Sequence, residues 1–112
     1  MSAPRSKQLY AGQVSAIAVN NVYTVPTATI TIIKSVAMRN PASGYTVVAV
    51  GGSFPAGGSN RVDILSTNLP GLAAGGSMGI VGQWVLNPGD GIEVNLQIGG
   101  PIQVWVSGVE LT

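Results

Sequence analysis

The chain has 112 residues, no histidine, no cysteine and four acidic residues, and its formal net charge is +1. This length suits one domain with one core. Most catalysis near neutral pH needs a group that exchanges protons, a thiolate or clustered metal ligands. The composition therefore argues against an enzyme, a disulfide scaffold and a thiolate metal site, and we expect no cofactor.

Charged residues make up only 8% of the chain, where about 25% is typical. Hydrophobic residues reach 46%, which is enough to form a core. A surface with few charges and a net charge near zero tends to associate. We therefore expect an oligomer or a part of a larger particle. The alternative is a monomer kept soluble by its Ser, Thr, Asn and Gln side chains.

Three classes of partner or destination are not expected. The five cations are scattered and form no basic stripe, so we expect no nucleic-acid binding. Polar residues or glycines interrupt every apolar stretch before the roughly 20 residues that a membrane helix needs. Residues 1–7 have no apolar segment after their charges, which predicts a flexible arm rather than a cleaved secretory leader, followed by one domain over 8–112.

Strand-type patterns begin directly after this arm. The runs over 8–13 and 15–25 are rich in β-formers, with Asn20-Asn21 as the expected turn and Pro26 as the end of the section. No window carries a regular helical repeat. The first part of the domain is therefore expected to be extended.

The strongest strand is expected over 28–40. Its even positions are apolar except for Lys34, and its odd positions are mostly small or polar. Either the Lys34 side chain reaches solvent at the end of the sheet, or a bulge at Ile33 reverses the two faces. Asn40 to Gly44 then forms a turn, because the residue before a proline avoids the helical region.

Glycine and proline divide the second half of the chain. Exposed loops are expected over 51–60 and 69–77, and the Asn-Pro-Gly-Asp-Gly segment over 87–91 predicts a hairpin-type turn. Further strands are expected over 45–50, 61–66, 78–86, 92–98 and 102–111. Alternation is regular in 92–98, where the residues expected to point inward are Ile92, Val94, Leu96 and Ile98.

The sum is about eight short strands at spacings of roughly 8–12 residues, which is typical of a β-sandwich or barrel. We therefore predict an all-β, single-domain antiparallel β-sandwich. Long glycine-rich connections favour a jelly-roll-like order, because such connections suit Greek-key crossovers.

Two sets of residues are candidates for an interface. Trp105 points away from the apolar face of its strand and is assigned equally to an interface or to the core, whereas Trp84 is expected in the core. The arm combines charge with apolar side chains and is a candidate to lie along a neighbouring subunit, through Arg5, Lys7, Leu9 and Tyr10. The alternative for the arm is a disordered terminus.

The acids offer little chemistry. Asp90 and Glu93 are the nearest pair, and a carboxylate pair is what glycoside hydrolysis uses. Asp90 lies in a turn, where an aspartate commonly bonds nearby backbone, and Glu93 lies on the polar face of a strand. Structural roles are therefore favoured for both, and no glycine-rich segment carries the lysine of a phosphate-binding loop.

Several short motifs along the whole chain resemble a known group of proteins. They are Leu9-Tyr10-Ala11-Gly12, Val22-Tyr23-Thr24-Val25-Pro26, Lys34-Ser35-Val36 with Asn40, Val85-Leu86-Asn87-Pro88-Gly89-Asp90 and Val106-Ser107-Gly108-Val109-Glu110. Together they are similar to small structural proteins of tailed bacteriophages. The chain departs from that pattern at Thr27, where a small turn sequence with glycine is common.

The resemblance implies a β-sandwich that packs as a homo-oligomer on a capsid or tail, and it carries over no catalytic residue. We expect a capsid decoration (cement) protein, made in the host cytoplasm, that bridges neighbouring major capsid subunits in the virion. Threefold lattice positions make a homotrimer the expected state. The alternatives are a tail, baseplate or neck component, and a carbohydrate- or host-receptor-binding module that stacks sugars on Trp105, Tyr45 and Tyr23.

Overall fold

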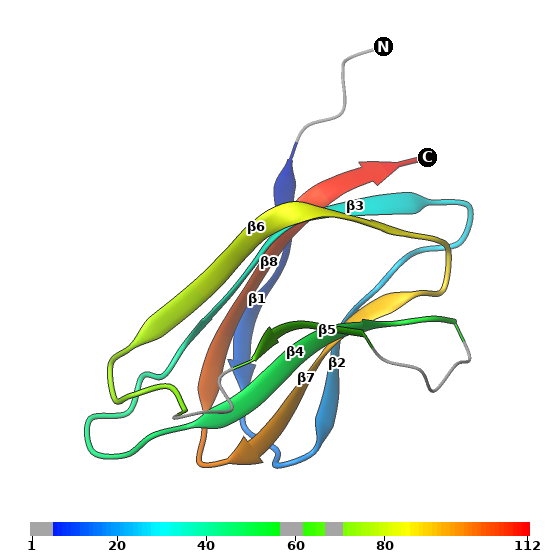
Figure 1. The fold of residues 1–112 in the computed structure, drawn as a ribbon. Coiled ribbons are helices and arrows are strands. Elements are labelled where there is room, and N and C mark those ends of the chain that lie inside the picture. The colour runs from blue at the N-terminus through cyan, green and yellow to red at the C-terminus, as the bar shows by residue number, and fades with distance from the viewer. Residues whose placement is uncertain (1–5, 57–61, 67–70) are drawn as a thin grey trace.

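The protein is an antiparallel sandwich of eight β-strands in two four-stranded sheets (Figure 1). The computed structural model describes residues 6–56, 62–66 and 71–112. The predicted all-β, antiparallel, two-layer fold is confirmed. The strands are β1 (Lys7–Val14), β2 (Val19–Thr24), β3 (Ile30–Arg39), β4 (Val48–Phe54), β5 (Val62–Ser66), β6 (Ser77–Leu86), β7 (Gly91–Ile98) and β8 (Ile102–Leu111).

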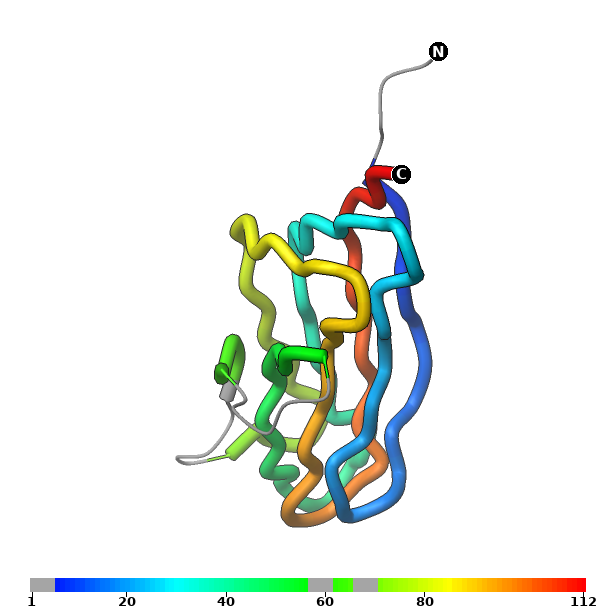
Figure 2. The backbone as a smooth tube through the Cα atoms, turned by 90° about the vertical axis from the view of Figure 1, so that its right-hand side faces the viewer, coloured from blue at the N-terminus to red at the C-terminus, as the bar shows by residue number. Residues whose placement is uncertain are grey.

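The chain crosses between the sheets at almost every step. Sheet A has the order β1-β8-β3-β6 and sheet B the order β2-β7-β4-β5, so only β4 and β5 are both consecutive and paired. The two layers lie against each other in Figure 2. The hairpin expected at 87–91 is therefore wrong, because this turn leads from β6 in sheet A to β7 in sheet B. Turn residues specify a reversal of the chain, but they do not specify which strands pair.

Of the two alternatives for the strongest strand, the bulge is the one that the structure confirms. The register of β3 against both β8 and β6 shifts between Ile33 and Ser35, and Lys34 is the inserted residue relative to β8. Ile33 is buried before the shift and Val36 after it. The bulge thus reverses the two faces, and it leaves the Lys34 side chain half-buried rather than in the core.

Two loop assignments are corrected. Asn20 and Asn21 lie inside β2, and the chain reverses before them, over 15–18. The segment 51–54, expected in an exposed loop, belongs to β4, where Gly51 is buried. A Cβ at Gly51 would lie 4.0 Å from the Val36 side chain of the facing sheet. This is an ordinary van der Waals distance, so the packing does not require glycine at this position. Composition alone does not distinguish a glycine in a buried strand from one in a loop.

The core lies between the inner faces of the two sheets. Its largest fully buried apolar side chains are Ile33, Val36, Met38, Ile102, Val104 and Val106 of sheet A with Ile92, Val94 and Leu96 of sheet B and Val47 just before β4. Ile98 was expected to point inward but is 61% exposed, because it ends β7 where the register with β4 shifts. The remaining alternation of β7 is as predicted.

Candidate interaction surface

The side chains that point away from sheet B form what we call the outer face of sheet A. In β8, Val104 and Val106 are fully buried while Trp105 between them is 40% exposed, so Trp105 belongs to this face. Trp105 pairs with Ala11 of β1 on one side and Ala37 of β3 on the other, and Ala37 pairs with Gly79 of β6. One indole ring thus stands in a row of otherwise very small residues.

This face exposes more apolar surface than a solvated sheet needs. Five of the ten large hydrophobic residues that are exposed in the described part of the chain lie on it. They are Ile30, Val81 (83% exposed), Val85 (62% exposed), Trp105 and Leu111. Ile30 lies opposite Leu111, and Ile32 lies between Val109 and Val85, so these side chains adjoin across three strands.

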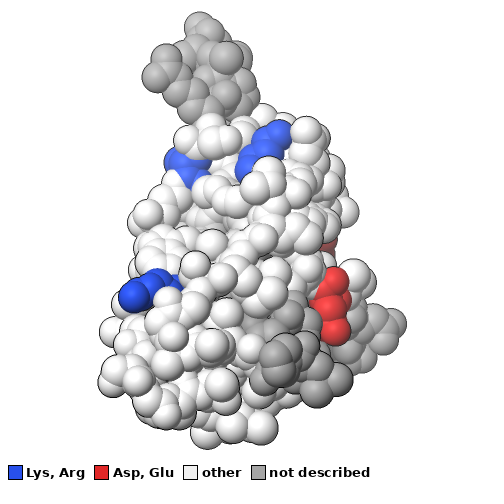
Figure 3. Space-filling view, turned by 60° about the vertical axis from the view of Figure 1, so that its left-hand side comes forward, with Lys and Arg blue, Asp and Glu red and all other residues white. Residues whose placement is uncertain are grey.

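Charge is nearly absent from the outer face of sheet A. Its described residues include no acid, and its cations are Lys34 at the bulge and Arg39 at the end of β3. The Arg39 Nη1 atom lies 3.4 Å from the Gln103 Oε1 atom that accepts its hydrogen bond. Most of the surface in Figure 3 carries no charged side chain. The exposed apolar residues are interspersed with uncharged polar ones, because Ser35, Ser107 and Gln83 lie between Trp105 and the group formed by Ile30, Val85 and Leu111.

The outer face of sheet B has a different chemistry. One row across it runs Asn21, Glu93, Gly52 and Asp63, on four adjacent strands. Asn95 lies opposite Val19 in the next row, and Val19 is 54% exposed. Two acids and two amides therefore occupy the equivalent positions on this sheet, which is the ordinary pattern of a face in contact with water.

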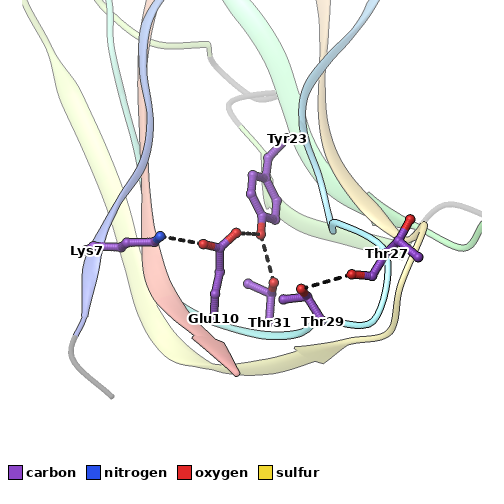
Figure 4. Close-up of polar contacts among 6 residues, drawn as sticks. All are labelled: Lys7, Tyr23, Thr27, Thr29, Thr31 and Glu110. Atoms are coloured by element: carbon purple, nitrogen blue, oxygen red, sulfur yellow. Dashed lines mark hydrogen bonds and ion pairs between the residues drawn. The ribbon is translucent and has the colours of Figure 1, made fainter. Parts of the chain in front are cut away.

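A polar chain closes one end of the sandwich and joins the two sheets (Figure 4). Lys7 Nζ of β1 lies 2.5 Å from Glu110 Oε1 of β8. The Tyr23 hydroxyl of β2 donates to Glu110 Oε2 at 2.7 Å and lies 2.8 Å from Thr31 Oγ1 of β3. Because Tyr23 uses its proton on the carboxylate, Thr31 is the donor of the second bond.

These contacts shift two pKa values in opposite directions. The hydrogen bond from Lys7, followed by that from Tyr23, lowers the pKa of Glu110 below its ordinary value of 4.5. Burial, together with the neighbouring Glu110 carboxylate, raises the pKa of Tyr23 to about 12. Both shifts favour the ionic form of Glu110 and the neutral form of Tyr23, which is the arrangement that joins the sheets.

The opposite end is held by a neutral side chain. Asn40 is fully buried, and its Nδ2 donates to the carbonyl oxygens of Tyr45 at 2.8 Å and Leu72 at 3.0 Å. Its Oδ1 accepts the Ala42 N–H at 3.0 Å. Asn40 thereby ties the loop after β3 to the loop before β6. The sequence marked Asn40 only as the start of a turn.

Asp90 performs the structural role expected of it. Its Oδ1 accepts the Ala56 N–H and its Oδ2 accepts the Asn87 N–H, each at 2.9 Å. Its carbonyl oxygen also accepts the Val25 N–H at 2.8 Å. Asp90 thus fixes the 87–91 turn and connects it to the segments that follow β2 and β4. Glu93 lies on the outer face of sheet B.

The sequence candidates do not converge on one surface. Arg5 lies outside the described residues, and Lys7 belongs to the polar chain of Figure 4. Leu9 and Tyr10 are half-buried in β1 and pack against the protein's own core. Trp84 also packs against the core, as expected, on the inner side of sheet A. Trp105 alone lies on the outer face, and its interface role stays a prediction.

The three aromatic residues considered for sugar stacking are separated. Tyr23 points into the polar chain between the sheets, whereas the Tyr45 hydroxyl donates to the Gly100 carbonyl oxygen at the other end of the sandwich. Trp105 lies five residues from Glu110 along β8, about 16 Å at the rise of a strand. These positions provide no common aromatic platform.

The sequence-based prediction of interface residues did not include the apolar residues that make up most of the exposed outer face of sheet A. Val81 and Val85 occupy odd positions of the 78–86 run, where they read as ordinary strand formers. The signal was their alternation with Ile80, Gly82 and Trp84, which places them on the opposite face of β6. Strand β6 therefore carries apolar residues on both of its faces.

Among the described residues there is no group of three potential metal-ligating acids, and no helix that could cross a membrane. Comparisons with protein families, with curated proteins and with solved structures found no match.

Proposed function

We propose that this protein is a non-enzymatic structural component of a tailed-bacteriophage virion, most simply a decoration protein that binds the outer capsid lattice and bridges neighbouring capsid subunits. The observation that carries the proposal is the exposed, nearly uncharged outer face of sheet A. A rigid sandwich with such a face suits adhesion, because burial of apolar surface and strand-edge contacts provide affinity without charge. The resemblance of the sequence motifs to phage structural proteins is the reason for proposing that the protein acts in a virion.

The order of the strands in the two sheets supports a jelly-roll topology. Sheet orders β1-β8-β3-β6 and β2-β7-β4-β5 arise when the chain crosses between sheets at nearly every step. We infer that the sandwich is of the jelly-roll type, in which two Greek keys of antiparallel strands face each other. A short, rigid unit of this kind presents a flat sheet face to a partner.

Reconstitution tests the proposed role. Particles of the source phage produced without this protein would be mixed with increasing amounts of the purified chain and then heated. We expect saturable binding and an increase in the temperature at which the particles release their DNA. Absence of binding to intact heads, with binding to isolated tails instead, would move the protein to the tail. Absence of binding to either would contradict the virion role.

A glycan array with the purified chain tests the carbohydrate alternative. Because Trp105, Tyr45 and Tyr23 lie apart, we expect no selective glycan binding. Selective binding that is lost in Trp105→Ala would instead favour a receptor-binding module.

A further inference from the structure

We propose that the free edge of β6, the side of this strand that does not pair with β3, receives an extended segment of a partner protein as a fifth strand of sheet A. The inference deepens the proposed structural role and rests on it, because it names a contact through which the protein would hold a neighbouring subunit. A protein that bridges two subunits needs two contact surfaces, and this edge is distinct from the outer face of sheet A.

Strand β6 is the longest edge strand in the described part of the chain. It pairs with β3 on one side, and no described strand pairs with its other side (Figure 1). Alternate residues of such a strand direct both the N–H and the C=O group outward, where water or an added strand bonds them. The 10 residues of β6 include no charged residue and no proline, two features that commonly block the addition of a strand.

The other three edge strands carry features that discourage pairing. Strand β5 has five residues, one of which is Asp63, and β2 has six residues and a register shift beside Tyr23. Strand β1 begins with Lys7, and its register shifts beside Tyr10. Short length, charge and bulges each protect an edge from another chain. Strand β6 is therefore the edge of this sandwich that is most open to an added strand.

The regular part of this edge suits a short, flexible segment. Pairing with β3 is uninterrupted over 77–81, whereas Gly82 and Gln83 together lie opposite Lys34. A segment of about five extended residues, about 16 Å long, would span the regular run. A flexible segment can follow the irregularity beyond Val81, whereas a preformed strand of another sandwich would have to distort its own pairing.

The core is incompletely covered along the same edge. Met78, Ile80 and Trp84 pack against the core, but each of them is only partly buried. Strand β5, the edge of sheet B on this side, has half the length of β6. An added strand would place alternate side chains beside these three residues and would remove part of their apolar surface from water. Backbone pairing and apolar burial therefore favour the same occupant.

These features specify the chemistry of the segment. It should be free of proline and charge over about five residues, and apolar at the alternate positions that face the core. The first seven residues of this chain do not meet that requirement, because they include Pro4, Arg5 and Lys7. The β6 strand of a second copy meets it poorly, because its core-facing side chains already pack against their own core.

Hydrogen exchange of the backbone amides of the full chain, measured by NMR, tests the inference. The probe is a peptide of about seven alternating valine and threonine residues with a lysine at each end, and the control peptide is N-methylated at every internal residue. The probe should slow exchange of the edge-facing amides over 77–81 by about 10-fold or more, and leave the edges of β1, β2 and β5 unchanged. The N-methylated peptide lacks the donors for strand pairing and should have no effect.

Two lysine substitutions locate the contact. Val81→Lys on β6 should weaken peptide binding by about fivefold, because a charge replaces an apolar cross-strand contact. Val62→Lys on β5 is the matched control, since both valines are more than half exposed, and it should bind the peptide as the wild type does. Circular dichroism verifies that both variants fold. Equal weakening by the two substitutions would contradict binding at β6.

The inference would be overturned if the peptide had no effect on β6, if it protected a different edge, or if the chain alone protected β6 by self-association. Particles of the source phage separate the inference from the proposed function. Binding to particles without slower exchange in β6, measured by mass spectrometry, would reject the edge contact and leave the virion role intact. Protection of β6 by the peptide without binding to particles would reject the virion role and leave the edge site intact.

Discussion

The interior of the sandwich and the outer face of sheet A differ in how well the surroundings of their side chains match their polarity. In the described part of the chain, no buried side-chain nitrogen or oxygen lacks a hydrogen-bond partner, and Asn40 illustrates this with three bonds. The outer face of sheet A instead leaves Val81 and Val85 in water. The polar groups of the interior are satisfied within one chain, whereas the outer face of sheet A leaves large apolar side chains exposed.

This difference separates two kinds of substitution. A change in the interior should alter the free energy of unfolding, while a change on the outer face should alter association and leave the fold intact. The predictions below test this separation, beginning with the largest expected effect on stability.

Asn40→Asp should have the largest effect. The substitution keeps the shape of the side chain but replaces the amide donor, so a carboxylate oxygen would face the carbonyl oxygens of Tyr45 and Leu72 in a buried position. We expect a loss of about 3 kcal/mol in the free energy of unfolding, measured by urea denaturation. The matched control is Asn21→Asp, because the Asn21 side chain bonds in an exposed position. Equal effects of the two substitutions would contradict the role of Asn40.

Glu110→Gln should have a smaller, pH-dependent effect. The lowered pKa of Glu110 means that its ion contributes stability above its ordinary value of 4.5, and this contribution disappears as the pH falls through the lowered value. The wild type should therefore exceed the variant by about 1 kcal/mol at pH 7, and the two should converge in acid. Denaturation across the pH range measures this. A pH-independent difference would contradict the account.

Ala28→Gly should stabilise the protein slightly. Ala28 has a φ of +59°, a left-handed conformation that costs an L-residue with a Cβ about 1 kcal/mol. We expect a gain of about 0.5 to 1 kcal/mol, visible as a higher Tm. At the exposed control position Ala74, the same substitution should be neutral or destabilising. A destabilised Ala28→Gly variant would show that the turn before β3 depends on the methyl group.

Trp105→Ala should have the smallest effect on the fold and a clear effect on association. Because Trp105 is outside the core, we expect less than about 1 kcal/mol of change in the free energy of unfolding, together with weaker self-association or particle binding. Trp84→Ala, which truncates a ring packed on the core, should instead cost about 2 kcal/mol or more. If circular dichroism finds Trp105→Ala unfolded, the interface role of Trp105 is wrong.

Local patterns predicted the strands well, because the alternation of side chains is a property of consecutive residues. The inward side chains of β7 up to Leu96 and the bulge beside Ile33 could be identified from the sequence for this reason. The pairing of strands could not, because it depends on contacts between distant segments. The turn over 87–91 has ideal hairpin residues and nevertheless joins two different sheets.

The candidate surface was predicted only through Trp105. A single aromatic residue can be identified as a candidate from the sequence alone. In contrast, Ile30, Val81 and Leu111 share one sheet face only because β3, β6 and β8 pair side by side. Gly108 shows a related limit. A Cβ there would lie 2.3 Å from the Ile32 carbonyl oxygen, a close approach at the β3 bulge that no local motif reveals.

The most direct test of the central claim is the copy number of this polypeptide in purified particles from its source, measured by quantitative mass spectrometry against the major capsid protein. The account predicts a number comparable to that of the capsid protein, as for a coating of the lattice. A handful of copies would assign the protein to a tail, neck or vertex instead. Complete absence from the particles would contradict the virion role.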